Sequence, residues 1–166
     1  MGELDFTRSL AVVIGINQYQ NGIAPLRTAV GDAEAIAQTL QNKHGYEVIT
    51  LLDENAQADA LRHLIQTTLP AQLSPNSRLL FYFAGHGIAQ DGDHGPAGYL
   101  IPQNAAPGKV ESYLPMVDLH DALTALPCRH FLAIFDCCFA GAFRWSSTRD
   151  ISWVPDVIHQ ERYDRF

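Results

Sequence analysis

Two stretches of sequence decide the fold: LLFYFAGHG at residues 79–87 and FLAIFDCCFAG at residues 131–141. Each is a run of apolar, β-forming residues that ends abruptly in small or chemically reactive ones. A near-continuous apolar run of this length is typical of a strand that is buried on both faces of a parallel sheet. Because ligands bind outside the carboxyl ends of such strands, His86 and Cys138 are expected where chemistry takes place.

The side-chain alternation of a strand separates the two adjacent cysteines of the second stretch. Successive residues project to opposite faces, so Asp136 and Cys138 are predicted to share one face and Cys137 to lie on the other. Cys138 would then have a carboxylate beside it. Cys137 is interpreted as a packed, structural thiol.

Strands and helices alternate along the rest of the chain. Strands are expected at residues 10–16, 47–52, 78–84 and 131–135, and helices at residues 32–40, 56–69 and 117–126. Asp32 is expected to cap the first helix and Pro70 to close the second. Residues 88–112, rich in Gly, Pro, Asp and Asn, are expected to form a long functional loop. The alternation predicts an α/β fold, a three-layer sandwich around a mostly parallel sheet.

The composition narrows the class of protein. A chain of 166 residues with 47% hydrophobic and 17% charged residues is typical of one cored, soluble domain or part of one. The net charge of −7 argues against nucleic acid or an anionic membrane as a partner. No apolar run approaches the ~18 residues of a membrane span, and the N-terminus lacks the apolar core of a signal peptide. Three cysteines, two of them adjacent, suit reduced thiols, so a cytoplasmic location is predicted.

The two strand-end motifs, taken in order, resemble the caspase clan. His86 precedes Cys138 by roughly 50 residues, which is the His-to-Cys spacing of caspases. His86-Gly87 and the run DCCFAG at residues 136–141 resemble the His-Gly and Asp-x-Cys-x-x-Gly motifs of the metacaspase and bacterial orthocaspase branch more than animal caspases. Residues 10–17 and 26–33 are also similar to that branch.

The resemblance implies a caspase-hemoglobinase fold and the activity of a cysteine endopeptidase, a hydrolase made as a zymogen. Cys138 would be the nucleophile and His86 its general base. The backbone N–H groups of Gly87 and Cys138 would form the oxyanion hole.

The same resemblance implies a substrate preference. Asp32 and Asp136 match the carboxylates that line the primary specificity pocket of metacaspases, so cleavage after Arg or Lys is expected. Animal caspases instead bind a substrate Asp with an Arg. Arg27 is the nearby candidate for that alternative.

No cofactor or metal is expected. Of the family's acidic calcium-binding region only Asp91 and Asp93 remain, which is too few oxygen ligands to predict a calcium requirement. The cysteines and histidines show neither Cys-x-x-Cys nor His-x-x-x-His spacing, so they do not predict zinc.

Residues 1–141 are expected to form the catalytic, large-subunit-like domain, and residues 142–166 a flexible linker or processing segment leading to an absent C-terminal part. The expected partners are a protein or peptide substrate, and a small-subunit segment or fused C-terminal domains. Two alternatives stay open. One is a non-catalytic caspase-like adaptor or regulatory module of a larger protein. The other is a flavodoxin-like binding domain, disfavoured because no glycine-rich phosphate loop follows the first strand.

Overall fold

A four-stranded parallel sheet forms the centre of the structure. The computed structural model describes residues 6–92 and 95–137, without the side chains of residues 91, 92, 95 and 96. In this part of the chain the strand order is β2-β1-β3-β7, and every neighbouring pair is parallel. The bounds are β1 Arg8–Gly15, β2 Glu47–Leu52, β3 Ser77–Ala84 and β7 His130–Asp136. The predicted α/β class and the four predicted strands are therefore confirmed.

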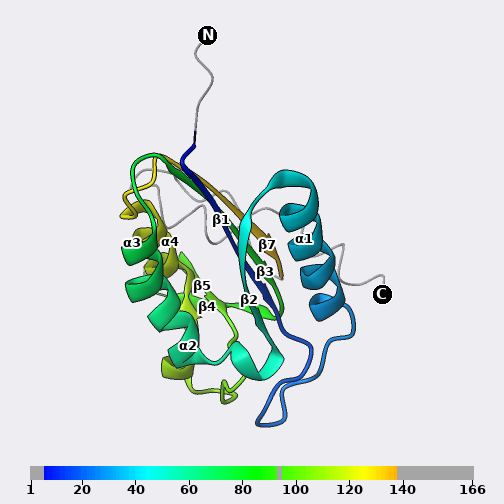
Figure 1. Ribbon diagram of the computed structural model, residues 1–166. Coiled ribbons are helices and arrows are strands. Elements are labelled where there is room, and N and C mark those ends of the chain that lie inside the picture. Colours follow the sequence, from blue (N-terminus) through cyan, green and yellow to red (C-terminus); the bar gives the residue numbers. More distant parts are fainter. Residues whose placement is uncertain (1–5, 93–94, 138–166) are drawn as a thin grey trace.

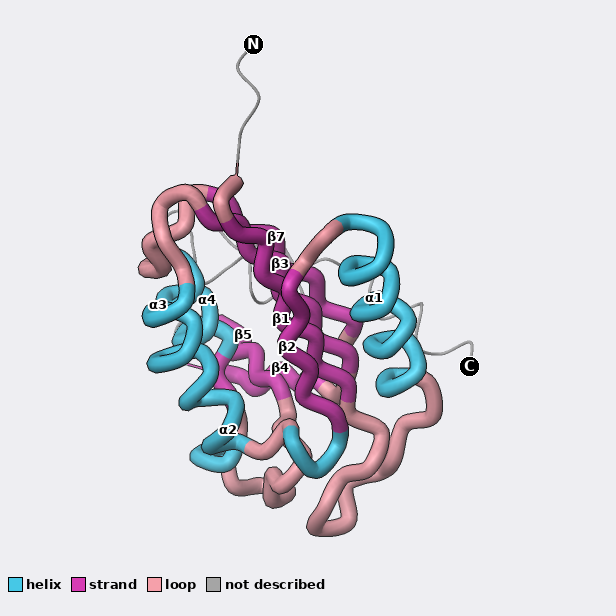
Figure 2. Tube along the Cα trace, in the orientation of Figure 1, coloured by secondary structure: helices cyan, strands magenta, loops and turns pink. Residues whose placement is uncertain are grey.

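Helices cover both faces of the sheet and complete the three layers (Figure 1). Helix α1 (Ala29–His44) lies on one face, and α2 (Ala58–His63), α3 (Leu69–Gln72) and α4 (Met116–Thr124) lie on the other. The chain passes from β1 through α1 to β2, and then returns through α2 and α3 to β3 (Figure 2). Consecutive crossovers thus use opposite faces, as in other doubly wound sheets.

The alternation of side chains along the strands divides the core into two clusters. The larger core cluster lies between the sheet and helices α2–α4, and includes Leu10, Val12, Ile14, Leu79, Phe81 and Phe83. The smaller core cluster lies under α1, and includes Ala11, Val13, Tyr82, Ala84 and the α1 residues Ala29, Ala33, Ala37 and Leu40. Both faces of β1 and β3 are buried, which explains why these strands read as continuous apolar runs.

The first helix begins earlier than predicted. It starts at Ala29, with Thr28 at the N-cap position and no side-chain capping bond, so Asp32 does not cap it. Asp32 lies in the first turn instead, and its backbone N–H donates to Thr28 O at 2.8 Å. The buried alanines of α1 recur every four residues from Ala29, so the apolar stripe that packs on the sheet fixes the true start. The helix ends at His44, four residues beyond the predicted end, and Gly45 follows as its C-cap with a left-handed φ of 66°.

Pro70 does not close the second helical segment. Helix α2 is followed by a wide turn of π geometry over Leu64–Thr68, and α3 continues from Leu69 with Pro70 in its first turn. Pro70 directly follows the π turn, where the regular i→i−4 hydrogen-bond ladder is already interrupted, so its missing N–H does not end the helical segment. The helical segment therefore extends to Gln72.

The long loop predicted for residues 88–112 is wrong over its first half. Strand β4 (Gly87–Gly92) pairs antiparallel with β5 (Gly95–Leu100), and β5 pairs with the short β6 (Leu114–Pro115). These strands are rich in Gly and Pro and lack the alternation that identifies a strand in sequence. The hairpin begins directly after His86, so it lies at the carboxyl edge of the main sheet.

Candidate active site

Strands β3 and β7 end together at the carboxyl edge of the sheet. Ala84 and Asp136 form the last pair of their register, and Gly85 N–H donates to Asp136 O at 3.3 Å. His86 therefore follows the end of one strand, and Cys137 follows the end of its neighbour. The predicted nucleophile, Cys138, lies outside the described residues.

His86 is held through its backbone and its ring. Its N–H donates to the Tyr19 hydroxyl oxygen at 2.7 Å, and its carbonyl accepts from Ile101 N–H at 3.0 Å. The imidazole Nε2 lies 2.8 Å from the Ala24 carbonyl oxygen, and the ring centroid lies 4.8 Å from that of Tyr19. Two contacts thus orient the half-buried imidazole, and two hydrogen bonds hold the backbone from which it extends.

The Ala24 contact fixes the tautomer of the imidazole. A backbone carbonyl can only accept a hydrogen bond, so Nε2 of His86 must carry the proton. In the neutral ring Nδ1 is then the atom with a lone pair available to take a proton. This is the arrangement that a general base next to a thiol requires.

The loop that supplies Ala24 is anchored at its beginning. Asp53 Oδ1 accepts hydrogen bonds from Asn17 N–H at 2.7 Å and Gln18 N–H at 2.8 Å. Gln20 N–H donates to Gln103 O at 2.9 Å, which ties the loop to the segment after β5. Sequence reasoning missed Tyr19, Ala24 and Asp53. The available signal for Tyr19 was an aromatic residue in a polar loop just after a buried strand.

The Gly87 N–H, the predicted oxyanion donor, lies at the start of β4. The hydrogen bond from Ile101 N to His86 O makes that pair a hydrogen-bonded position of the ladder. Because such positions alternate in antiparallel pairs, the next pair, Gly87 and Leu100, is a non-hydrogen-bonded one. The ladder thus leaves the Gly87 N–H available for another acceptor.

The two predicted specificity carboxylates lie on the same face of the sheet. Asp32 lies in the first turn of α1 and Asp136 at the end of β7, and both are exposed. Burial raises the pKa of Tyr82 to about 12, with further contributions from the charges of Asp136 and Asp32 and from its side-chain hydrogen bond to Asp136. The buried Tyr82 therefore has both carboxylates in its surroundings, and the two exposed acids form an acidic surface beside α1.

The adjacent cysteine, Cys137, lies on the opposite face. It is half-buried and packs against the larger core cluster, whereas Asp136 lies on the Tyr82 face. The predicted alternation thus holds for Asp136 and Cys137. Burial also raises the pKa of the Cys128 thiol, which keeps this buried cysteine protonated and unreactive.

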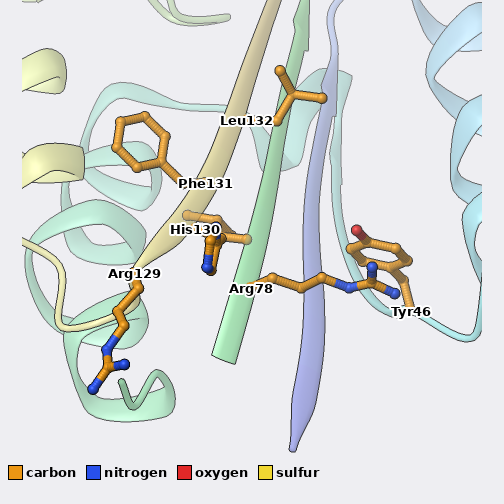
Figure 3. A pocket seen from close by; sticks show the side chains of 7 residues that line it. Tyr46, Arg78, Arg129, His130, Phe131 and Leu132 are labelled. Carbon is orange, nitrogen blue, oxygen red and sulfur yellow. The ribbon is translucent and has the colours of Figure 1, made fainter. Parts of the chain in front are cut away.

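An open hollow of about 340 Å³ lies at the other end of the strands, around Arg78 and His130 (Figure 3). The Arg78 guanidinium carbon lies 4.8 Å from the centroid of the Tyr46 ring and 5.0 Å from that of Phe6. Arg78 and His130 pair at the first register position of β3 and β7, whereas Ala84 and Asp136 pair at the last. The hollow is therefore separate from the candidate active site.

The described residues include no group of three or more His, Cys, Asp or Glu side chains able to hold a metal ion. Of the two candidate calcium ligands, the side chain of Asp91 and the whole of Asp93 fall outside the described part. Within that part every helix is also too short or too polar to cross a lipid bilayer.

Comparison with known proteins identifies the family. The family described as Caspase domain matches residues 8–162. This match covers most of the chain, so the protein belongs to the caspase-domain family. None of the curated proteins compared with the chain gives a significant match.

Solved structures support the same fold. The crystal structure of a protein from Geobacter sulfurreducens is similar with a TM-score of 0.65 and 20% sequence identity, over 79% of this chain and 50% of that one. The present chain thus spans about half the length of that protein. At this identity the likeness concerns the fold alone.

Replacing Gly85 by Ala should destabilise the protein by about 1–3 kcal/mol, because overpacking forces neighbours to move. An added Cβ would lie 2.7 Å from the Tyr19 hydroxyl oxygen and 3.0 Å from the Phe83 ring. In the control variant Gly31→Ala, the Cβ meets nothing within 4 Å. That change in α1 should stabilise by up to about 1 kcal/mol. Urea denaturation followed by circular dichroism measures both, and equal effects would contradict the assigned contact.

Proposed function

We propose that this chain is the catalytic domain of a cysteine endopeptidase of the metacaspase and orthocaspase branch, which cleaves peptide bonds after Arg or Lys. The observation that carries the proposal is the His86 imidazole, oriented by the Ala24 carbonyl at the tip of β3. The neighbouring strand β7 leads into the Cys137-Cys138 pair. A cytosolic, reducing compartment suits this reaction because the nucleophile must remain a thiol.

In the proposed reaction, His86 Nδ1 takes the proton of the Cys138 thiol, and the thiolate attacks the scissile carbonyl carbon. The Gly87 and Cys138 N–H groups bind the resulting oxyanion. The imidazolium then donates its proton to the leaving nitrogen, and the C–N bond breaks to leave a thioester. Water, deprotonated by His86, hydrolyses the thioester and releases the thiol. Throughout, Ala24 O accepts from Nε2–H and stabilises the charged ring.

The acidic surface formed by Asp32 and Asp136 around the buried Tyr82 supports the preference for basic residues. A guanidinium has five donors in a planar fork that suits carboxylate oxygens, and an ammonium is attracted by the same charges. The hydrogen bond from Tyr82 would hold the Asp136 carboxylate in one orientation. Arg27, the candidate for binding an acidic substrate residue, is exposed in the loop before α1.

We further propose that β7 receives an additional strand from a small-subunit segment. In the described part of the chain β7 pairs with β3 alone, so it is the edge strand of the four-stranded sheet there. Phe131, Leu132 and Ile134 are 38%, 55% and 40% exposed on this strand, whereas apolar residues of β1 are buried. A neighbouring strand would cover both the backbone edge and these side chains.

Changing either Cys138 or His86 to Ala should lower kcat/KM for arginyl and lysyl fluorogenic peptides by at least about 10³-fold, because the two groups act as a unit. Cys137→Ala is the control, and it should retain activity because that residue packs against the core. Purified full-length gene product is assayed. Absence of turnover on arginyl, lysyl and aspartyl peptides would favour the adaptor function instead.

Asp32→Asn and Asp136→Asn should each lower kcat/KM for arginyl peptides by roughly 10–100-fold, because each removes a charge-assisted hydrogen bond. Glu34→Gln is the control: this acid is exposed on the same helix, and its loss should leave kcat/KM unchanged. Cleavage after Asp that depends on Arg27, with no effect of the two Asp variants, would overturn the proposed specificity.

The additional strand predicts a change in hydrogen exchange. Backbone amides of residues 130–136 should exchange faster in the 166-residue chain alone than in a form that carries the proposed small-subunit segment, as followed by mass spectrometry of peptides. Residues 77–84 of the central strand β3 serve as the reference and should be equally protected in both. Equal exchange at residues 130–136 would contradict the proposal.

A further inference from the structure

We propose that Tyr19 is a positioning residue that holds the His86 imidazole in its working orientation. This inference rests on the proposed function, since it concerns how the general base of that reaction is kept in place. Tyr19 belongs to the loop after β1, and His86 follows β3, 67 residues further along the chain. The contact therefore exists only in the folded protein.

Tyr19 contacts His86 in two different ways. Its hydroxyl oxygen accepts the backbone N–H of His86 at 2.7 Å, and its ring lies 4.8 Å from the imidazole at an interplanar angle of 44°. The hydrogen bond fixes the backbone from which the imidazole extends. The ring contact limits rotation of the imidazole away from the Ala24 carbonyl. A substitution that removes only the Tyr19 hydroxyl would abolish the contact with the His86 backbone and retain the ring contact.

The residue before His86 is adapted to the same tyrosine. A Cβ at Gly85 would lie 2.7 Å from the Tyr19 hydroxyl oxygen, so the glycine provides the space that the hydroxyl occupies. The N–H of Gly85 is used by Asp136 O, the last carbonyl of β7. Tyr19 therefore packs against the point where the two strand ends are joined.

Tyr19 is itself fixed on both sides. Gln18 N–H is bound by Asp53 Oδ1, and Gln20 N–H by Gln103 O. The phenol ring packs against the larger core cluster and against a third cluster formed by Ile101, Ala105 and Tyr113. Burial is the main cause that raises the pKa of Tyr19, and the charge of Asp53 adds to it, so the hydroxyl stays protonated.

The surroundings of Tyr19 also include a residue that is adjacent in sequence to the predicted nucleophile. Cys137, which packs against the same core cluster as Tyr19, immediately precedes Cys138. Tyr19 thus contacts the proposed general base and shares a core cluster with the residue before the proposed nucleophile. The two exposed acids of the specificity surface are near Tyr82 instead. A change at Tyr19 should therefore act on the chemical step more than on binding of the basic side chain.

The test compares Tyr19→Phe with Tyr113→Phe in the full-length protein. Tyr113 is a matched control because its hydroxyl also accepts a backbone N–H, that of Gly108 at 3.0 Å, and the described residues show no contact between it and His86. Tyr19→Phe should lower kcat by roughly 10–100-fold with little change in KM, since small misplacements of a reacting group have effects of this size. Tyr113→Phe should leave kcat unchanged, and equal kcat values at equal thermal stability would overturn the proposal.

A second measurement does not depend on turnover. In the Cys138→Ala background, ¹⁵N NMR of the imidazole should show the Nε2–H of His86 protected from solvent exchange in the Tyr113→Phe variant and exchanging faster in Tyr19→Phe. Unchanged exchange would refute positioning by Tyr19. An inactive wild-type protein with faster exchange in Tyr19→Phe would refute the peptidase function while leaving the positioning role supported.

Discussion

The hydrogen-bonded register between β3 and β7 determines the geometry at the carboxyl edge of the sheet. It runs from Arg78 opposite His130 to Ala84 opposite Asp136. A slip by one residue would turn every side chain of β7 to the other face. Asp136 would then leave the face of Tyr82, and Cys137 would leave the larger core. The apolar contact of Phe81 with Phe135, whose ring centroids lie 6.1 Å apart, opposes such a slip because it belongs to one face only.

The orientation of His86 depends on segments that are distant in sequence. Ala24 and Tyr19 come from the loop after β1, and Ile101 follows β5. Asp53, at the end of β2, holds the start of the loop. Each contact is a hydrogen bond that involves a backbone group, or a packing contact between rings. Such contacts between distant segments do not persist in an unfolded chain, and they form when the sheet assembles. Strand β3 determines only that His86 lies at the carboxyl edge of the sheet. The direction of its imidazole is therefore determined by tertiary contacts.

This dependence explains which parts could be predicted from the sequence. The strands were predictable because burial on both faces leaves a continuous apolar run, and the positions of His86 and Asp136 followed from where those runs stop. The contact made by Ala24 was not predictable, because every residue has a backbone carbonyl and the identity of the side chain does not indicate which carbonyl will accept a hydrogen bond. The β4–β5 hairpin was missed since Gly and Pro conceal its strands. The start of α1 was misplaced because the packing of Ala29 outweighs the capping preference of Asp32.

At the carboxyl edge of the sheet, the two faces carry different kinds of side chain. The acidic surface of Asp32 and Asp136 lies on the α1 face, whereas Cys137 and Tyr19 pack with the larger core cluster. A bound peptide that placed a basic side chain against the acids would have to present its carbonyl carbon at the edge itself. In the proposed reaction, the thiol that attacks this carbon must not be packed in the core, which disfavours Cys137 as the nucleophile. The proposed choice of Cys138 over Cys137 as the nucleophile thus rests on the two-residue period of a strand, and not on any difference in their intrinsic reactivity.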